Sequence, residues 1–195
     1  MKKRWFDYLW FAEIAYFSLG FFNILFAWLG LLNMMLPLAF ALFGGSKAYC
    51  GRYCGRSQLF SLLGGRFGLS RHAVPPVFLR GRAFRFGFLA FFCVMFGAML
   101  WNTALVFSGA RDLQTAVTLL WTFRVPWQWA WHGGAASWAA QFAFGFYSIM
   151  LTSTILGLIT MALFRPRTWC VYCPMGTATQ LICRAKAAAK GQDRI

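Results

Sequence analysis

Long apolar runs that carry almost no charge dominate the sequence. Glu13 is the one charged residue between positions 8 and 44, and two later runs, from about Phe86 to Phe107 and from about Gln141 to Phe164, contain none. A helix needs about 20 apolar residues to cross the hydrocarbon core of a membrane. A soluble domain is roughly one quarter charged, whereas this chain is 12% charged. The runs therefore predict an integral membrane protein.

The first run is too long for one crossing and long enough for two short ones. Gly30 and Asn33 favour a turn between two helices, and Pro37 suits the first turn of the second helix. That second helix would extend from about Met34 to Phe43. With the two later runs, the sequence predicts an all-α fold with about four transmembrane helices.

The segments between the runs are expected at the membrane surface. A short helix is predicted near Ser57–Leu63, and the amphipathic stretch from Asp112 to Phe123 predicts an interfacial helix. Indole rings favour the level of the lipid headgroups, so a tryptophan belt is expected after that helix, at Trp127, Trp129 and Trp131. Residues 1–195 would thus form a single membrane domain.

Lysines and arginines are divided very unevenly between the two sides of the predicted helices. Of 19 such residues, Arg111 and Arg124 fall on one side, and the other 17 fall on the side of both termini. Cytoplasmic loops carry the excess of positive charge, so we expect both termini in the cytoplasm and the chain in a bacterial inner membrane. Basic residues at the ends of apolar runs suit membrane lipid and not a nucleic acid, which is not an expected partner.

The two halves of the chain also resemble each other in sequence. An Ala-Leu-Phe run precedes each of two close cysteine pairs, Cys50 with Cys54 and Cys170 with Cys173. Both halves would start on the same side of the membrane, which predicts two parallel two-helix repeats related by an axis along the membrane normal. The repeats would cover residues 1–80 and 81–195, approximately. Such an axis brings equivalent loops together, so the two pairs should face each other at the cytoplasmic surface.

Four cysteine thiolates that converge from two loops suit an iron–sulfur cluster or a tetrahedral metal ion. Basic neighbours would support an anionic cluster, depress the thiol pKa values and raise the reduction potential; they are Lys47, Arg52, Arg56, Arg165 and Arg167. Pro174 would shape the turn after the last cysteine. The same cysteines could instead bind structural zinc, form two redox-active dithiols or be unrelated surface thiols. Cys93 is expected to be a small buried hydrophobic residue, and Cys183 is a weaker ligand candidate on a surface helix.

The motif Cys-Gly-Arg-Tyr-Cys-Gly, which starts at Cys50, and the motif Arg-Thr-Trp-Cys-Val-Tyr-Cys-Pro, which ends at Pro174, resemble those of a membrane ferredoxin-type family. The family includes quinol-dehydrogenase membrane subunits of periplasmic nitrate reduction, regulators of nitrous oxide reduction and methylamine-utilisation ferredoxin-type proteins. Its members show Cys-x3-Cys-Pro twice, at cytoplasmic helix ends. Here Gly55 replaces the first proline, and the second pair is spaced by two residues. The soluble ferredoxin tail that many relatives carry is not expected. The resemblance implies one [4Fe–4S] cluster.

The sequence therefore predicts an electron-transfer component of an oxidoreductase complex in the membrane. Electrons would pass between quinone, or a cytoplasmic donor, and a partner redox subunit, soluble ferredoxin or flavoprotein. Glu13 is the candidate to accept a proton from quinol, because an acid within an apolar run is costly and marks function. A hydrogen bond from Glu13 to Asn or Tyr neighbours is the alternative. For the whole chain, the alternatives are a four-helix thiol–disulfide oxidoreductase coupled to quinone, or a membrane scaffold with structural zinc.

Overall fold

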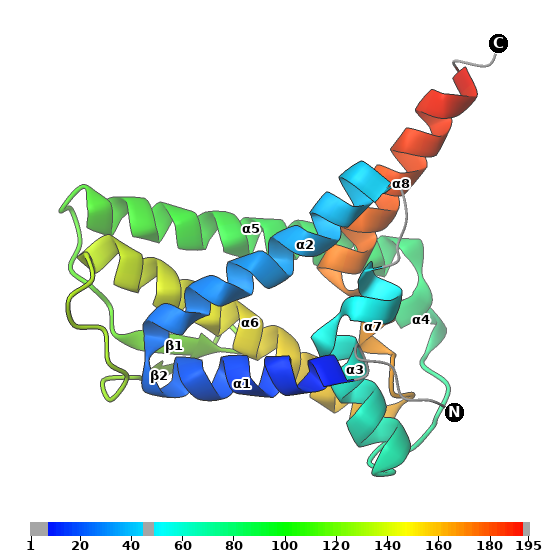
Figure 1. Cartoon of the computed structure of the whole chain (residues 1–195), viewed down its shortest axis with the longest axis horizontal. Coiled ribbons are helices and arrows are strands. Elements are labelled where there is room, and N and C mark those ends of the chain that lie inside the picture. Colours follow the sequence, from blue (N-terminus) through cyan, green and yellow to red (C-terminus); the bar gives the residue numbers. More distant parts are fainter. Residues whose placement is uncertain (1–7, 45–48, 193–195) are drawn as a thin grey trace.

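Helices make up most of the protein. The computed structural model describes residues 8–44 and 49–192 and contains 73% helix and 6% strand. Figure 1 shows an elongated bundle from which the end of α8 projects. In chain order, the elements are α1 (Leu9–Phe22), η2 (Ile24–Trp28), α2 (Leu29–Gly44), η3 (Tyr49–Tyr53), α3 (Gly55–Ser61), η4 (Leu62–Arg66), α4 (Val77–Arg80), α5 (Arg82–Phe107), β1 (Ala116–Leu119), β2 (Phe123–Pro126), α6 (Ser137–Leu163), α7 (Trp169–Tyr172) and α8 (Pro174–Gln192).

Three helical segments are long and apolar enough to cross a membrane: Ile24–Gly44, Arg82–Phe107 and Ser137–Leu163. α1 is also apolar, but its 14 residues span only about 21 Å, less than the roughly 30 Å of a hydrocarbon core. α6 is the most enclosed of the three, because 61% of its apolar stretch is buried inside the protein. α5 buries only 6% of its apolar stretch and turns its side chains outward. The chain thus has the helix lengths and composition of a membrane protein, and three of the four predicted crossings reach the required length.

The first apolar run breaks at Asn23, and not at Gly30 and Asn33 as predicted. The Asn23 side-chain carbonyl accepts a hydrogen bond at 3.0 Å from the backbone N–H two residues further on, which caps the turn η2. Backbone hydrogen bonds on both sides of Asn23 join Trp131 and fix the break in place. The second helix is therefore longer than predicted, and Pro37 lies in its interior and not in its first turn.

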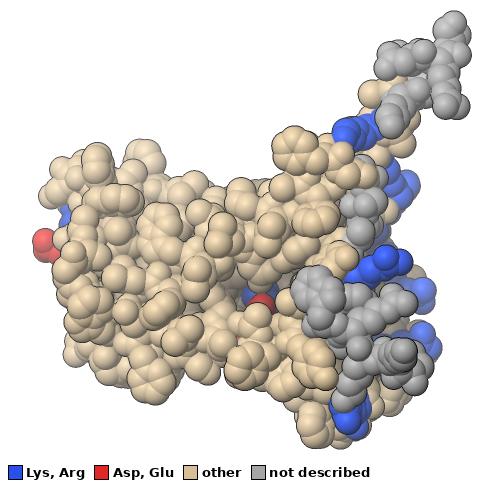
Figure 2. All heavy atoms as spheres, viewed as in Figure 1, with Lys and Arg blue, Asp and Glu red and all other residues tan. Residues whose placement is uncertain are grey.

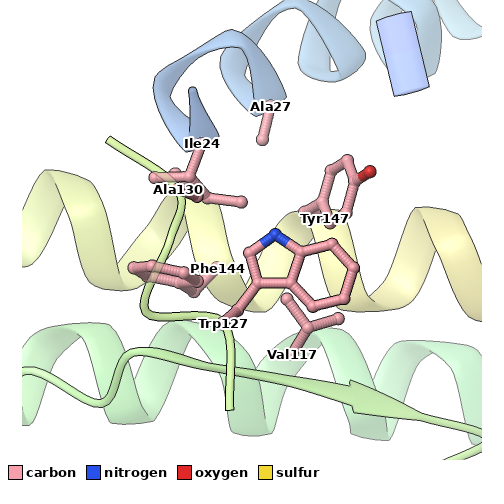
Figure 3. Packing of buried hydrophobic residues seen from close by; sticks show 8 residues of the cluster. Ile24, Ala27, Val117, Trp127, Ala130, Phe144 and Tyr147 are labelled. Atoms are coloured by element: carbon pink, nitrogen blue, oxygen red, sulfur yellow. The ribbon is translucent and has the colours of Figure 1, made fainter. Parts of the chain in front are cut away.

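The prediction of an interfacial helix over residues 112–123 is wrong. β1 and β2 form an antiparallel hairpin in this part of the chain. The hairpin packs against α6, where Val117 is fully buried in one cluster with Phe144, Tyr147 and Trp127 (Figure 3). Packing of one strand face against α6 favours a strand here, although the same residues also fit a helical pattern.

Hydroxyl groups of α6 accept hydrogen bonds from the backbone at the outer edge of β1. The Thr118 N–H donates to Ser148 Oγ at 3.0 Å, and the Leu120 N–H donates to Thr152 Oγ1 at 3.2 Å. Thr152 lies near the middle of α6. If α6 crosses the membrane, the tip of the hairpin lies at membrane depth, where water cannot pair with an open strand edge. The hydroxyl groups of α6 thus explain how a hairpin is tolerated there.

Basic side chains gather at one end of the bundle. Figure 2 shows most of the described lysines and arginines at the end where α3, α4 and α7 lie, and a middle region that is almost free of charge. The opposite end holds the connection from α5 to β1 (Figure 1). The fold therefore keeps the uneven charge distribution seen along the sequence, while the side of the membrane that the basic end faces stays a prediction.

Candidate metal centre

All four predicted cysteine ligands line one cavity. Cys50 and Cys54 come from η3 and the start of α3, and Cys170 and Cys173 come from α7 and the start of α8. The cavity has a volume of about 90 Å³, several times the roughly 10–15 Å³ that one water molecule requires. The two pairs therefore border the same space, as the internal repeat predicts, and leave room for a group of several atoms.

A short helical turn holds each pair. The Cys54 N–H donates to the Tyr49 carbonyl at 3.0 Å, and the Cys173 N–H donates to the Trp169 carbonyl at 2.9 Å. Tyr49 and Trp169 directly precede the two pairs and are buried, so each anchors its turn. Pro174 then starts α8, where its fixed φ and missing N–H suit the first turn of a helix. The position of Pro174 agrees with its predicted role in shaping this turn.

Hydroxyl groups of each half contact a sulfur of the other half. Ser57 Oγ on α3 lies 3.6 Å from Cys170 Sγ, and Thr179 Oγ1 on α8 lies 4.0 Å from Cys50 Sγ. Both hydroxyl residues are buried. Ser57 and Thr179 could not be predicted from the sequence, because each is close in sequence to one cysteine pair but contacts the other pair. The reciprocal contacts tie the two cysteine loops together.

Two of the four thiols have raised pKa values. Burial raises the pKa of the Cys54 thiol to about 12, although Arg56 acts in the opposite direction. Cys170 is exposed as a residue, but partial loss of water around its thiol still raises the pKa of that thiol, against the effects of the Ser57 hydrogen bond and of Arg167. Arg56 and Arg167 thus lower these pKa values, as predicted for basic neighbours, but burial has the larger effect and the net pKa of each thiol is raised. Loss of water destabilises each thiolate more than the nearby cations stabilise it.

The predicted basic residues occupy different positions. Arg56 lines the cavity, and its Nε forms an ion pair with Glu13 Oε1 at 2.9 Å. Lys47 lies outside the described residues. The three others are exposed and are not part of the cavity wall: Arg52, Arg165 and Arg167. Among the described members of the predicted set, Arg56 is thus the one that could compensate negative charge from within the wall.

Glu13 belongs to a buried polar network. Glu13 is 4% exposed. Its carboxylate accepts one hydrogen bond from Arg56 Nε and another, at 3.3 Å, from Asn33 Nδ2. The Tyr49 hydroxyl donates to Asn33 Oδ1 at 3.0 Å, and Arg56 Nη1 donates to Ser153 Oγ at 2.7 Å. The network connects α1, α2, α6 and the first cysteine loop. Glu13 and Arg56 are separate candidates in the sequence, and the fold brings them together.

The two remaining cysteines lie outside the cavity. Cys93, predicted to be buried, is exposed on α5. The reason is that α5 turns most of its side chains outward; on a membrane-crossing helix, that surface would face lipid, where a small thiol is tolerated. Cys183 is partly exposed on α8 and does not line the cavity.

A groove between α1 and α2 adjoins the cysteine cavity. Its volume is about 390 Å³, and apolar side chains of the two helices form most of its wall. Glu13, Asn33 and Tyr49 add polar groups, and Asn33 and Tyr49 line the cysteine cavity as well. The groove and the cavity therefore share part of one wall.

Within residues 8–44 and 49–192, no three histidine, cysteine, aspartate or glutamate side chains form a group that could hold a single metal ion. The four thiols border a common cavity without forming such a group. The chain matches no protein-family model, no curated protein and no solved structure. The chemistry of the site therefore rests on its own residues. Four thiols, a largely buried cation and the Ser57 hydroxyl line one cavity, and the Thr179 hydroxyl contacts one of the thiols.

Proposed function

We propose that the protein is a membrane electron-transfer component that holds one [4Fe–4S] cluster on Cys50, Cys54, Cys170 and Cys173. The observation that carries the proposal is the convergence of these thiols, from two distant parts of the chain, on one cavity. An all-cysteine cluster requires four thiolate ligands. The resemblance of the two motifs to the membrane ferredoxin-type family supports the same conclusion.

The surroundings of the cavity suit such a cluster. A volume of about 90 Å³ admits a group of several atoms, and Arg56, whose charge Glu13 balances in part, places a cation in the cavity wall. Ser57 and Thr179 supply hydroxyl groups beside two of the sulfurs. Hydrogen bonds to sulfur, nearby charge and burial are the means by which a protein sets a cluster's reduction potential. When bound, the cluster would accept and release single electrons, and the chain would hold it, shield it from water and tune it.

We further propose that a quinone is one redox partner and binds in the groove between α1 and α2. A quinone has an apolar body and carbonyl groups, and the groove combines apolar walls with the polar groups of Asn33 and Tyr49. The shared wall would bring the quinone ring near the cysteine cavity. Glu13 lies in the same wall and is the proposed proton acceptor. The second partner would be a redox subunit, an acidic ferredoxin or a flavoprotein that docks at the basic end.

We place the basic end and both cysteine pairs in the cytoplasm of a bacterium with the chain in its inner membrane, because cytoplasmic loops carry the excess of positive charge. Two exposed arginines at opposite ends of α5 allow a matched test. A membrane-impermeant thiol reagent added to intact cells should label Arg111→Cys and should not label Arg80→Cys. The reverse pattern would overturn the orientation.

Metal analysis of the full chain, purified without oxygen, tests the cluster. We expect about four iron and four sulfide ions per chain, with a paramagnetic signal in one redox state. Cys50→Ser and Cys173→Ser should each abolish the signal, because each leaves three thiolates. Cys93→Ser and Cys183→Ser are the matched controls, since neither residue lines the cavity, and both should keep their iron.

Other outcomes of the same measurements would contradict the cluster. One zinc ion per chain without iron would favour the structural scaffold. Cysteines that cycle between thiol and disulfide when quinone is added, without bound iron, would favour the thiol–disulfide oxidoreductase. Full retention of iron by Cys50→Ser would refute a site shared between the two pairs.

A further inference from the structure

A second pocket, separate from the cysteine cavity, lies between the start of α5 and the first half of α8. Arg82 and Arg85 line it from α5, and Arg184 lines it from α8, together with Thr177 and Gln180. Its volume is about 30 Å³, so it would take a compact chemical group and not a whole small molecule. Three guanidinium groups around so small a space repel one another unless an anion lies between them.

No acidic side chain of the described chain balances these arginines. The acidic residues within residues 8–44 and 49–192 are Glu13 and Asp112. Glu13 forms its ion pair with Arg56. Asp112 lies beyond the far end of α5, a helix of 26 residues that is about 39 Å long. At that distance, salt screens its charge almost completely.

Arg85 has a donor group that none of the described residues satisfies. One terminal nitrogen of its guanidinium donates to Gln180 Oε1. Its Nε is buried and has no hydrogen-bond partner among the described residues. A buried donor on a charged group is costly when it stays unpaired. A guanidinium binds phosphate oxygens through paired hydrogen bonds, so the three arginines that line the pocket suit a phosphate group.

The rim of the pocket is apolar. Phe86 and Leu181 line it and are 43% and 40% exposed. The pocket lies at the first turn of α5, one of the three helices long enough to cross a membrane. A membrane-crossing helix places its first turn near the lipid headgroups, with its apolar surface beside the acyl chains. Cationic groups next to an exposed apolar rim therefore suit a phosphate that is attached to a lipid.

We propose that Arg82, Arg85 and Arg184 bind the phosphate group of an anionic phospholipid. The site depends on the membrane location of the chain and not on the cluster or on electron transfer. Its ligand chemistry is a phosphate group, which free inorganic phosphate shares. The exposed apolar rim formed by Phe86 and Leu181 favours the lipid as the source.

Lipid binding by the full chain can be measured by native mass spectrometry from detergent, with added phosphatidylglycerol or phosphatidylcholine. We expect selective retention of phosphatidylglycerol. Arg85→Gln and Arg184→Gln should each weaken it by about tenfold, as expected for the loss of one charge-assisted contact. Arg80→Gln is the matched control: it removes the same charge from an exposed residue near the pocket that does not line it, and should leave retention within about twofold.

Arg184→Gln keeps the test valid if Arg85→Gln does not fold, because Arg184 is exposed. Equal weakening by Arg80→Gln and Arg184→Gln would show attraction by diffuse charge and would overturn the site. Equal retention of the two lipids would do the same. Displacement of phosphatidylglycerol by millimolar inorganic phosphate alone would assign the pocket to free phosphate and overturn the lipid.

Discussion

Replacement of Glu13 by Gln should destabilise the protein strongly, because it leaves the Arg56 charge without its counterion. The carboxylate is buried, and the side chains of Arg56 and Glu13 are 12% and 4% exposed. Removal of one partner of a buried ion pair costs about 3–5 kcal/mol. Arg56 keeps two neutral acceptors, Ser153 Oγ at 2.7 Å and Met150 Sδ at 3.4 Å. These contacts offset part of the loss, so we expect about 3 kcal/mol, the lower end of that range.

The free energy of unfolding can be measured by titrating purified protein with a denaturing detergent. Arg56→Met alone should cost a similar amount, because it leaves the Glu13 carboxylate buried. The double variant Glu13→Gln/Arg56→Met removes both charges and should recover most of the loss. Arg52→Met is the control: this exposed arginine lies on η3, four residues before Arg56, and its loss should change the free energy by less than about 0.5 kcal/mol. A cost of Glu13→Gln below about 1 kcal/mol, or a loss in the double variant equal to the sum of the two single losses, would refute the role of the ion pair.

Other substitutions test the packing of α6. Gly157→Ala should lower the free energy of unfolding by about 1–3 kcal/mol, because its new methyl group would overlap the buried ring of Phe60. Gly97→Ala on α5 is the control, because open space surrounds that position. An equally large loss from Gly97→Ala would refute the explanation. Thr152→Val should cost about 1–3 kcal/mol, because it removes the partner of the hairpin's backbone. Thr103→Val, which loses only a bond within its own helix, should be nearly neutral, and equal losses from both threonine variants would contradict the role of Thr152. All four variants can be compared by the same detergent titration.

The local pattern of the sequence was sufficient to predict several helices. The predicted third helix, Phe86–Phe107, and fourth helix, Gln141–Phe164, correspond to α5 and α6 within a few residues, because an uninterrupted apolar run has no other regular structure of that length. The two cysteine pairs were also identifiable as one site from their repeated context. Their position on a common cavity agrees with the predicted repeat, which would relate equivalent loops.

Other features depended on packing and were predicted wrongly. The break of the first run moved to Asn23, because Trp131 of a distant segment binds the backbone there. Residues 112–123 contain a strand, because α6 supplies both an apolar surface and hydroxyl partners for its edge. Local spacing carries no information about such partners, which lie elsewhere in the chain.

The sequence by itself determined the class of chain, the uneven placement of its charges and the four cysteines that could share a centre, since each depends on composition and spacing along the chain. Only the tertiary structure decided which groups surround those cysteines. Ser57 and Thr179 each contact a sulfur of the opposite half, and Arg56 pairs with Glu13 from a different helix. The physical reason is that a buried charge or polar group needs a partner, and the partner is whichever side chain the packing of distant helices brings within hydrogen-bonding distance.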